Sequence, residues 1–409
     1  MAHFWQGLRS GEWLTPARAR GYSLILLGLY VLAVAGWIAS SDGLIDRNGK
    51  PLGTDFSNVY AAGELTWQHH AAEAYQPGLQ HAAEKAVFGG REVPFYGWHY
   101  PPFFFAVAVT VAAMPYGWGL SIWLATSLLA YLAAMRAILP RPETLLIAAA
   151  FPAVFVNIGH GQNGFLTTAL LGGALHLLDR RPWLAGVLIG LLTYKPQFGM
   201  LIPIALLASG RWRTIGAAVT TIAGLLALSF VTLGGDVWHA FANSMTFTQT
   251  VVLEQGGTGW EKIQSIFSAV RMWGGSVQLA YAVQIALAAL LAASLAWLWH
   301  SDAAFELKAA ALAVGSLLAT PYVLDYDLVV LGLAIAYFAR LGLRQGFRPC
   351  EISLLAAAWI APLLSRGLAE VTAMPLGLLV LLALYAFILR RAARDHNSLT
   401  IANQGLAQA

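Results

Sequence analysis

The sequence has 409 residues, of which 58% are hydrophobic and 11% are charged. Because soluble domains carry roughly 25% charged residues, this composition excludes an ordinary soluble enzyme and is typical of a polytopic membrane protein. The formal net charge of +4 then points to arginine and lysine in cytoplasmic loops rather than to a nucleic-acid-binding surface. The single cysteine, Cys350, excludes an intramolecular disulfide.

The first predicted membrane span covers residues 21–40, which are almost entirely apolar. A spanning helix needs about 20 such residues. Arg9, Arg18 and Arg20 precede the span and place the N-terminus on the cytoplasmic side. No small-residue cleavage pattern follows it, so we expect a retained helix rather than a removed signal peptide.

Residues 41–99 form a long polar stretch after this span. It is predominantly acidic and contains four of the ten histidines, His69, His70, His81 and His99. After a span that starts inside, this stretch is expected on the outer face as the first extracytoplasmic loop. Residues 58–70 and 80–87 are expected to form short helices lying on the membrane surface.

The remaining apolar segments predict eleven further spans, at residues 102–115, 118–138, 144–158, 164–178, 183–209, 214–233, 277–299, 304–320, 328–339, 352–365 and 373–389. About twelve spans would place both termini on the cytoplasmic side. Residues 235–275 form a second extracytoplasmic stretch. Since no soluble domain or internal repeat is visible, residues 1–409 are predicted to be a single all-α integral membrane domain.

Three arginine pairs conflict with this simple alternation. Arg136 with Arg141, Arg180 with Arg181, and Arg211 with Arg213 all have the character of cytoplasmic residues but lie one span apart. Either some segments between residues 143 and 209 are re-entrant, or Arg180 and Arg181 face outward, for example towards an anionic lipid head.

Asp55 is the first candidate for chemistry, in the segment GTDFSNVYAAG at residues 53–63. A carboxylate about fifteen residues beyond the first span lies near the membrane surface and could deprotonate a bound hydroxyl. The alternative is an ordinary loop acid, or a helix N-cap for a helix that begins near Ser57.

Aromatic residues surround His99 in the segment FYGWHYPPF, residues 95–103. They predict either an interfacial aromatic belt or a platform on which a sugar stacks. In the segment GHGQNG at residues 159–164, His160, Gln162 and Asn163 could bind substrate or cap a turn.

Two further positions place charge between apolar segments. Lys195, in YKPQ at residues 194–197, needs an anionic partner such as a phosphate or a carboxylate, unless it snorkels from a helix end. Asp325 and Asp327 could cap a helix or, in a transporter, bind a proton or a cation. P-loop, dinucleotide-binding, HExxH and GxSxG motifs are absent from the sequence, which argues against a nucleotide donor.

Taken in order, these segments resemble glycosyltransferase family 87, integral-membrane enzymes of the GT-C type that include mycobacterial mannosyltransferases using polyprenol-phosphate mannose. The matching pieces are Asp55-Phe56 with Tyr60 and Ala62-Gly63, Tyr100-Pro101-Pro102, residues 161–164, and residues 185–197. Mycobacterial members carry histidines after a Ser-Pro pair where this chain has Thr320-Pro321 and then Leu324 to Asp327. A histidine role at that position is therefore not transferred.

The resemblance implies a GT-C fold with its catalytic pocket on the outer face, a lipid-phosphate sugar as donor, and inversion at the anomeric carbon. An acid in the first outer loop is the usual general base of such enzymes, and here it corresponds to Asp55. One base can suffice because phosphate leaves without protonation.

Candidate ligands of the donor phosphate are Lys195, Arg271 and His99. Candidates for sugar or acceptor contacts are Tyr60, Trp98, Tyr100, His160, Gln162, Asn163, Gln197, Gln264, Tyr326 and Asp327. In residues 257–274, Trp260, Lys262 and Ser265 could also make such contacts; the alternative for this stretch is an interfacial helix with snorkelling basic residues.

The sequence therefore predicts an inverting glycosyltransferase that moves a hexose, with mannose preferred, from polyprenyl phosphate to a hydroxyl of an outer-face lipid or glycan. Its expected partners are membrane lipids, this donor and the acceptor, without nucleic acid. Its expected location is the bacterial inner membrane, with the active site on the periplasmic side. No cofactor is expected, although a divalent metal held by Asp55 with Asp325 or Asp327 is an alternative. A secondary transporter that uses Lys195, Asp325 and Asp327, or a non-catalytic lipid-binding protein, also stays open.

Overall fold

Helices make up the fold that a computed structural model gives for residues 2–407, with side chains described for residues 5–395. Within that range no β-strand forms, and strand-like pairing is limited to three isolated bridges. An all-helical fold is expected for a membrane-embedded chain, because a helix satisfies its backbone hydrogen bonds without water. The fold confirms the predicted all-α class and is consistent with the membrane protein that the composition predicts.

Seven of the described helical segments are long and apolar enough to cross a membrane. They are Pro16–Ala39 (α2), Tyr116–Ile138 (α6), Trp212–Leu233 (α12), Val277–His300 (α15), Asp325–Gln345 (η7 and α17), Glu351–Thr372 (α18) and Leu376–Asp395, the first part of α19 (Leu376–Ala407). At 1.5 Å per residue, each reaches the thickness of a hydrocarbon core of about 30 Å.

Four shorter apolar segments accompany them, at Pro102–Ala112, Gly164–Leu177, Pro182–Tyr194 and Pro196–Ala208. They contain α5 (Phe105–Ala112), α9 (Gly164–Leu177), α10 (Pro182–Leu191) and α11 (Ile202–Ala208). The remaining helices are α1 (Ala2–Ser10), α3 (Phe56–Trp67), α4 (Pro77–Val87), α7 (Thr144–Ala149), α8 (Pro152–His160), α13 (Gly235–Phe247), α14 (Ile266–Met272) and α16 (Phe305–Leu318). The count of twelve crossings therefore stays a prediction.

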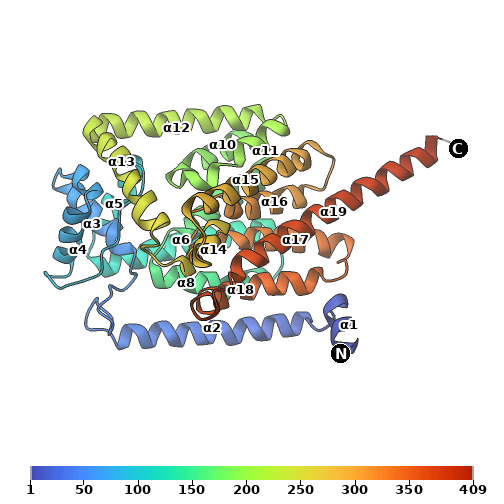
Figure 1. The fold of residues 1–409 in the computed structure, drawn as a ribbon, viewed down its shortest axis with the longest axis horizontal. Helices are drawn as coiled ribbons and strands as arrows, with labels where there is room; N and C mark the ends of the chain where they lie inside the picture. Colours follow the sequence, from blue (N-terminus) through green and yellow to red (C-terminus); the bar gives the residue numbers. More distant parts are fainter. Residues whose placement is uncertain (1, 408–409) are drawn as a thin grey trace.

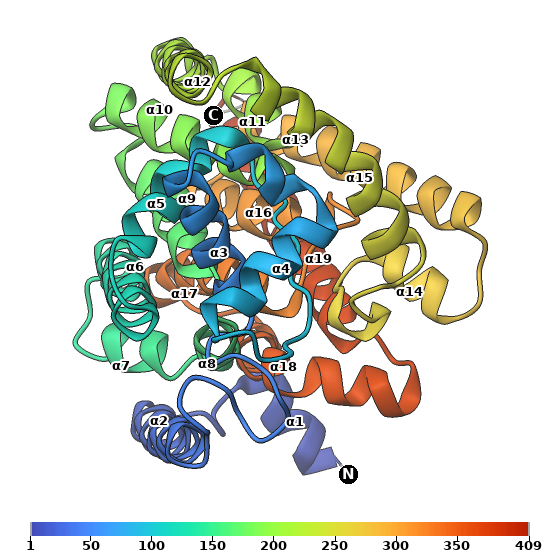
Figure 2. The same cartoon turned by 90° about the vertical axis from the view of Figure 1, so that its left-hand side faces the viewer.

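The two ends of the helix bundle differ in character (Figure 1). The long helices run roughly parallel, both chain termini lie at one end, and α3 and α4 gather at the other. Figure 2, viewed from this second end, shows α3 and α4 in front of the bundle. We call this second end the loop end, because it carries the helices of the first loop.

Arginines from distant parts of the chain meet at the end that holds the termini. Arg20 pairs with Glu143, Arg211 lies 2.5 Å from Asp179, and Arg340 donates to the carbonyl of Ile138 at 3.2 Å. These contacts join the start of α2 to the start of α7, the start of α12 to the end of α9, and the last part of α17 to the end of α6. We call this the basic end.

The basic end resolves the conflict between the arginine pairs. Because Arg211 pairs with Asp179, the residue next to Arg180, both arginine pairs lie at the same end. The segment 183–209, expected as one span, instead breaks at Lys195 into α10, two short 3-10 turns and α11. Lys195 reaches the loop end, where it pairs with Asp327, and the chain returns to Arg211. The segment therefore turns back, as the re-entrant alternative predicts, and Arg180 and Arg181 lie at the same end of the bundle as Arg211.

The expected span at residues 102–115 also differs. The hydroxyl of Tyr75 donates to the carbonyl of Tyr100 at 2.7 Å, and that of Tyr60 donates to the carbonyl of Met114 at 2.8 Å. Both flanks of α5 thus contact the first loop, so α5 starts and finishes at the loop end. Pro101 and Pro102 precede α5, which has only eight residues. It is therefore too short to reach the basic end.

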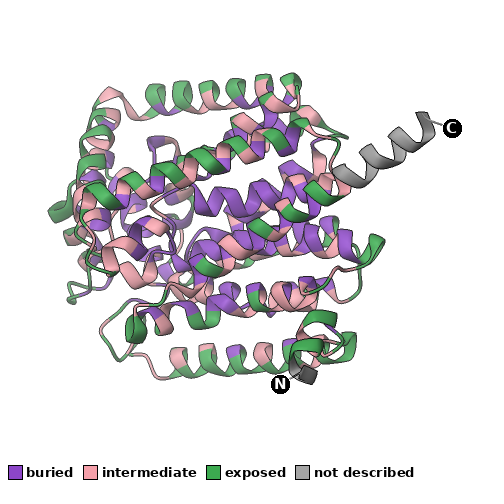
Figure 3. Cartoon of the chain, turned by 45° about the vertical axis from the view of Figure 1, so that its right-hand side comes forward, coloured by how far each residue is buried: buried purple, intermediate pink, exposed green. Residues whose placement is uncertain are grey.

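The centre of the bundle is α16, in which every residue from Ala309 to Leu318 is buried. Figure 3 shows this buried centre, with many exposed residues in α2 and α12 on the outside. In the first loop, α3 and α4 overlap the two expected helical segments, but α3 does not lie on a surface. Most of its residues are buried, and it packs against α5.

The contact between α3 and α5 predicts a strong effect at Gly63. A methyl group there would lie 2.2 Å from the backbone carbonyl oxygen of Ala108. Gly63→Ala should therefore destabilise the protein by roughly 1–3 kcal/mol through overpacking, measured as a lower melting temperature in detergent. Gly78→Ala in α4 is the matched control, since nothing lies within 4 Å of its added methyl group. Equal melting temperatures for the two variants would contradict this packing.

Candidate active site

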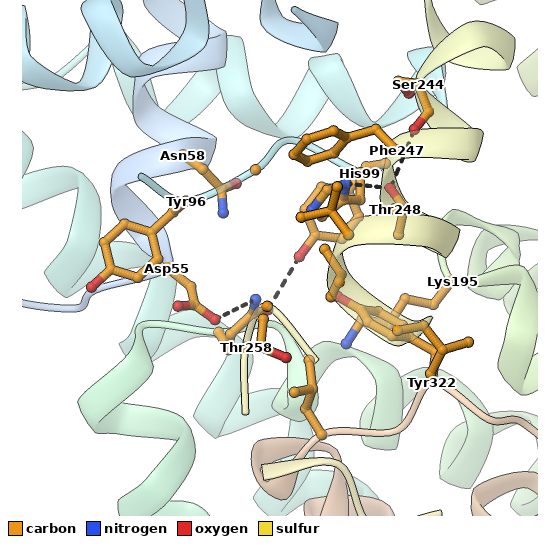
Figure 4. Close-up of a pocket in the computed structure, with 18 of the residues that line it drawn as sticks. Asp55, Asn58, Tyr96, His99, Lys195, Ser244, Phe247, Thr248, Thr258 and Tyr322 are labelled. Carbon is orange, nitrogen blue, oxygen red and sulfur yellow. Dashed lines mark hydrogen bonds between the residues drawn. The ribbon is translucent and has the colours of Figure 1, made fainter. Parts of the chain in front are cut away.

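A cavity of about 590 Å³ opens at the loop end of the bundle. Its walls come from segments far apart in sequence, at residues 55–58, 94–101, 160–162, 194–197, 241–253, 257–262 and 322–326. Figure 4 shows Asp55, Asn58 and Tyr96 on one side of it and His99, Thr248, Lys195 and Tyr322 on the other. Among the residues expected to act in the site, those that line this cavity are Asp55, His99, Tyr100, His160, Gln162, Lys195, Gln197, Lys262 and Tyr326.

Asp55 occupies the N-cap position of α3, but its side chain makes no capping hydrogen bond. The carboxylate instead accepts a hydrogen bond from Nε2 of Gln162 at 3.1 Å on Oδ2. Its Oδ1 lies 3.7 Å from Nδ1 of His160, and about a fifth of the side chain is exposed. The capping alternative therefore does not account for Asp55, whose charge is directed into the cavity.

The turn between α8 and α9 positions the partners of Asp55. Gly161 adopts a left-handed conformation with φ of 60°, and a Cβ there would lie 2.7 Å from Cβ of Phe56. The turn therefore packs directly on the start of α3, and the backbone N–H of Asp55 donates to the carbonyl of His160 at 3.1 Å. Gln162 also accepts from the hydroxyl of Tyr100 at 3.2 Å and donates to that of Tyr326 at 3.3 Å.

Electrostatics keep Asp55 ionised. Burial would raise the pKa of Asp55, but contact with His160, the hydrogen bond from Gln162 and the positive charge of Lys262 together lower it below its ordinary value. Burial would likewise lower the pKa of His160, but contact with Asp55 and the charge of Asp325 raise it. The two groups therefore stabilise each other's charged forms.

Lys195 has a carboxylate partner within the protein. Its Nζ lies 2.6 Å from Oδ1 of Asp327, and both side chains are almost fully buried. The other oxygen of Asp327 accepts from the backbone N–H of Leu324 at 3.1 Å. Asp327 thus caps a turn and neutralises Lys195, which excludes snorkelling for this lysine. Asp325 lies 3.9 Å from Arg366 and accepts from the backbone N–H of Tyr326.

His99 faces the cavity from the loop before α5. Its Nδ1 lies 2.7 Å from the hydroxyl of Thr248, and burial lowers the pKa of His99 to about 4. At neutral pH it is therefore uncharged, so it can contact a phosphate through a hydrogen bond but not through an ion pair.

Several expected site residues lie outside the cavity wall. Arg271 donates to the carbonyls of Gly275 and Glu254, at 2.6 and 3.1 Å, and its guanidinium lies over Trp260. Trp98 is buried behind Tyr100, with ring centroids 5.0 Å apart. Tyr60 bonds to Met114, Asn163 donates to the hydroxyl of Tyr100 at 2.8 Å, and Gln264 donates to the carbonyl of Glu261 at 3.0 Å. These side chains, like that of Asp327, do not face the cavity. They bind to protein groups behind its wall.

The cavity also contains residues that the sequence did not single out as site candidates. They include Lys50, Asn58, Phe247, Thr248, Thr258 and Tyr322. Oδ1 of Asn58 and Oγ1 of Thr258 are buried without a hydrogen-bond partner among the described groups. Tyr96 and Tyr322 supply the aromatic surface that the FYGWHYPPF segment suggested. No motif marks these residues, because they meet only when the loops fold over the bundle.

Metal ligands do not cluster in the described part of the chain. There, no group of three or more His, Cys, Asp and Glu side chains is placed to hold a metal ion. Asp55 and Asp325 both line the cavity, where Asp55 contacts His160 and Asp325 lies near Arg366.

Comparison with known proteins connects this geometry to a family. The sequence model of glycosyltransferase family 87 matches residues 98–321, just over half of the chain. No curated protein and no solved structure matches with significance. The matched range contains the segments at 100–102, 161–164 and 185–197, whereas Asp55 precedes it. The evidence for Asp55 in this structure is therefore its position in the cavity.

Proposed function

The chain belongs to glycosyltransferase family 87, and we propose that it moves a hexose from a polyprenyl-phosphate donor to a hydroxyl of an outer-face lipid or glycan. Mannose is the first hexose to test. The observation that carries the proposal is the Asp55 carboxylate, which is held by His160 and Gln162, makes no helix cap, and faces a cavity at the loop end.

The chemistry needs one base. Asp55 takes the proton of the acceptor hydroxyl as its oxygen attacks C1 of the sugar, and the bond between C1 and the phosphate oxygen breaks. The electron pair of that bond leaves with the polyprenyl phosphate, and attack from the opposite face inverts the anomeric carbon. Each carboxylate oxygen has two lone pairs. Thr54 and His160 lie near Oδ1 and Gln162 donates to Oδ2, so Oδ2 keeps one lone pair for the incoming hydroxyl.

The sidedness follows from the charge distribution. Arginines gather at the basic end, and the positive-inside rule assigns such an end to the cytoplasm. The cavity at the loop end would then face the periplasm of a bacterial inner membrane, where lipid-phosphate sugars are accessible and nucleotide sugars are scarce. The apolar residues of α13 and the following π-helix (Thr248–Glu254) support a lipid donor, since they form one wall of the cavity.

A donor panel tests this proposal. Purified protein in nanodiscs, supplied with an extract of membrane lipids and glycans as acceptor, should transfer sugar from polyprenyl-phosphate mannose or a related lipid-phosphate hexose. It should not transfer sugar from GDP-mannose or UDP-glucose. Transfer from a nucleotide sugar but from none of the lipid donors would contradict the proposed donor class.

The lowered pKa of Asp55 predicts the acid limb of the pH profile. The ionised form of Asp55 is the active base, and it is lost only as the pH falls through a pKa below the ordinary carboxyl value. The kcat/KM for transfer should therefore show no loss from this group between pH 7 and about 5. In His160→Ala the acid limb should move to higher pH, because burial then raises the pKa of Asp55 without the opposing contact. An unmoved acid limb in His160→Ala would contradict the pairing.

A further inference from the structure

The positive charges around the cavity are not equally free to bind an anion. Lysines 50, 195 and 262 line it, together with His99 and His160. Lys195 is neutralised by Asp327 at 2.6 Å, His160 is paired with Asp55, and His99 is uncharged. The charge still available inside the cavity is that of Lys262, whereas Lys50 lies on the exposed loop at its mouth.

Lys262 is held in place by its backbone. The next residue, Ile263, forms a bridge with Leu324, and the N–H of Gln264 donates to the carbonyl of Val323 at 2.8 Å. These contacts fix Lys262 beside Asp325, in the wall that faces Asp55. Its side chain is partly buried, and no hydrogen bond or ion pair with another described residue occupies its amine.

The loop that leads to Lys262 has a second free group. In the segment GGTGWEK, residues 256–262, Gly256 and Gly259 have backbone φ angles of 70° and 84°, which residues other than glycine rarely adopt. The turn that they allow presents Thr258 to the cavity, where Figure 4 draws it among the lining residues. Oγ1 of Thr258 is buried and has no partner among the described groups.

We propose that Lys262 and the hydroxyl of Thr258 bind the phosphate of the lipid donor, which places the leaving group under the loop of residues 256–262. This inference rests on the proposed function. The sugar-linked phosphate carries one negative charge, which a single lysine can balance. As C1 separates from the phosphate oxygen, the phosphate gains a second charge, so Lys262 stabilises the transition state more than the bound donor.

Binding of polyprenyl phosphate, the product without its sugar, tests the subsite directly. The full chain in nanodiscs is titrated with polyprenyl phosphate and with uncharged polyprenol of the same length. Lys262→Ala should weaken binding of the phosphate at least about tenfold, and Thr258→Val should weaken it by about threefold to tenfold. Lys262→Arg should retain most of the affinity, and all variants should bind polyprenol like the wild type. Lys85→Ala, on α4 outside the cavity, is the matched control.

The outcomes separate the subsite from the function. If the wild type prefers the phosphate but Lys262→Ala and Thr258→Val bind it equally well, this subsite is wrong and the donor class stands. A loss in Lys50→Ala without a loss in Lys262→Ala would move the site to the mouth and also overturn it. A wild type that binds polyprenyl phosphate no better than polyprenol would overturn the donor class as well. Inorganic phosphate at millimolar concentration should displace polyprenyl phosphate only weakly. Displacement by inorganic phosphate as effective as that by unlabelled polyprenyl phosphate would identify a free-phosphate site instead.

In turnover, Lys262→Ala should lower kcat more than it raises KM for the donor, because its contact strengthens as charge develops. A variant that changes KM alone would contradict a role in the departure of the phosphate.

Discussion

Asp55→Asn should lower the rate of sugar transfer by about a thousandfold, the middle of the range for removal of a general base. Asparagine has nearly the same volume and can still bond to Gln162, but it cannot take a proton from the acceptor. Because the Asp55 side chain does not cap α3, the variant should fold and melt like the wild type. The measurement is the initial rate of transfer from the lipid donor at saturating acceptor.

Two other carboxylates serve as comparisons for Asp55. Glu92 lies in the same first loop and is mostly exposed, so Glu92→Gln should leave the rate unchanged. Asp325 lines the cavity but lies close to Arg366, and Asp325→Asn should lower the rate less than Asp55→Asn does. A larger loss in Asp325→Asn, with Asp55→Asn still active, would transfer the role of base to Asp325.

Asp327→Ala should have the largest effect on stability, about 3–5 kcal/mol, because it leaves the buried Lys195 without its partner. The double variant Lys195→Met with Asp327→Leu removes both charges and should recover most of the lost stability. Thermal melting of the purified proteins in detergent measures both effects. Equal melting temperatures for Asp327→Ala and the wild type would show that the pair is not formed.

The same double variant also tests whether Lys195 binds donor. If the phosphate lies against Lys262, the folded double variant should bind polyprenyl phosphate with a Kd within about threefold of the wild-type value. A loss comparable to that of Lys262→Ala would return Lys195 to the phosphate site.

The sequence predicted well what depends on local chemistry. Composition indicated a membrane-embedded helical chain, and the motif around Asp55 led to a carboxylate that lines the cavity at the loop end. Gln162 and His160 were expected near substrate, and the structure places both against Asp55. These residues could be expected in the site because each belongs to a short segment with polar residues between apolar stretches.

What the sequence missed depends on distant contacts. Lys195 clearly needed an anion, but only the fold brings it to Asp327, which lies 132 residues away in the chain. Hydropathy could not show that residues 183–209 turn back at Lys195, because a re-entrant pair of short helices is as apolar as one span. Thr258 was not expected in the site, because the glycine turn at residues 256–259 that brings it to the cavity resembles any other loop in sequence.

These differences shift the electrostatic description of the site. Lys195 belongs to a neutral buried pair beneath Tyr326, whose ring lies 5.1 Å from the lysine amine. That pair supports one wall of the cavity, and the proposed phosphate site lies instead in the loop of residues 256–262. Asp55 and the proposed phosphate site therefore come from two loop segments that line the same cavity at the loop end of the bundle.

The most direct test of this account is the release of polyprenyl phosphate from polyprenyl-phosphate mannose by the purified protein in nanodiscs, with a membrane extract as acceptor. We predict time-dependent release by the wild type and release near background by Asp55→Asn at equal protein. If mannose is not the sugar, the same result is expected with another lipid-phosphate hexose. Absence of release with every hexose donor, or equal release by Asp55→Asn, would contradict the account.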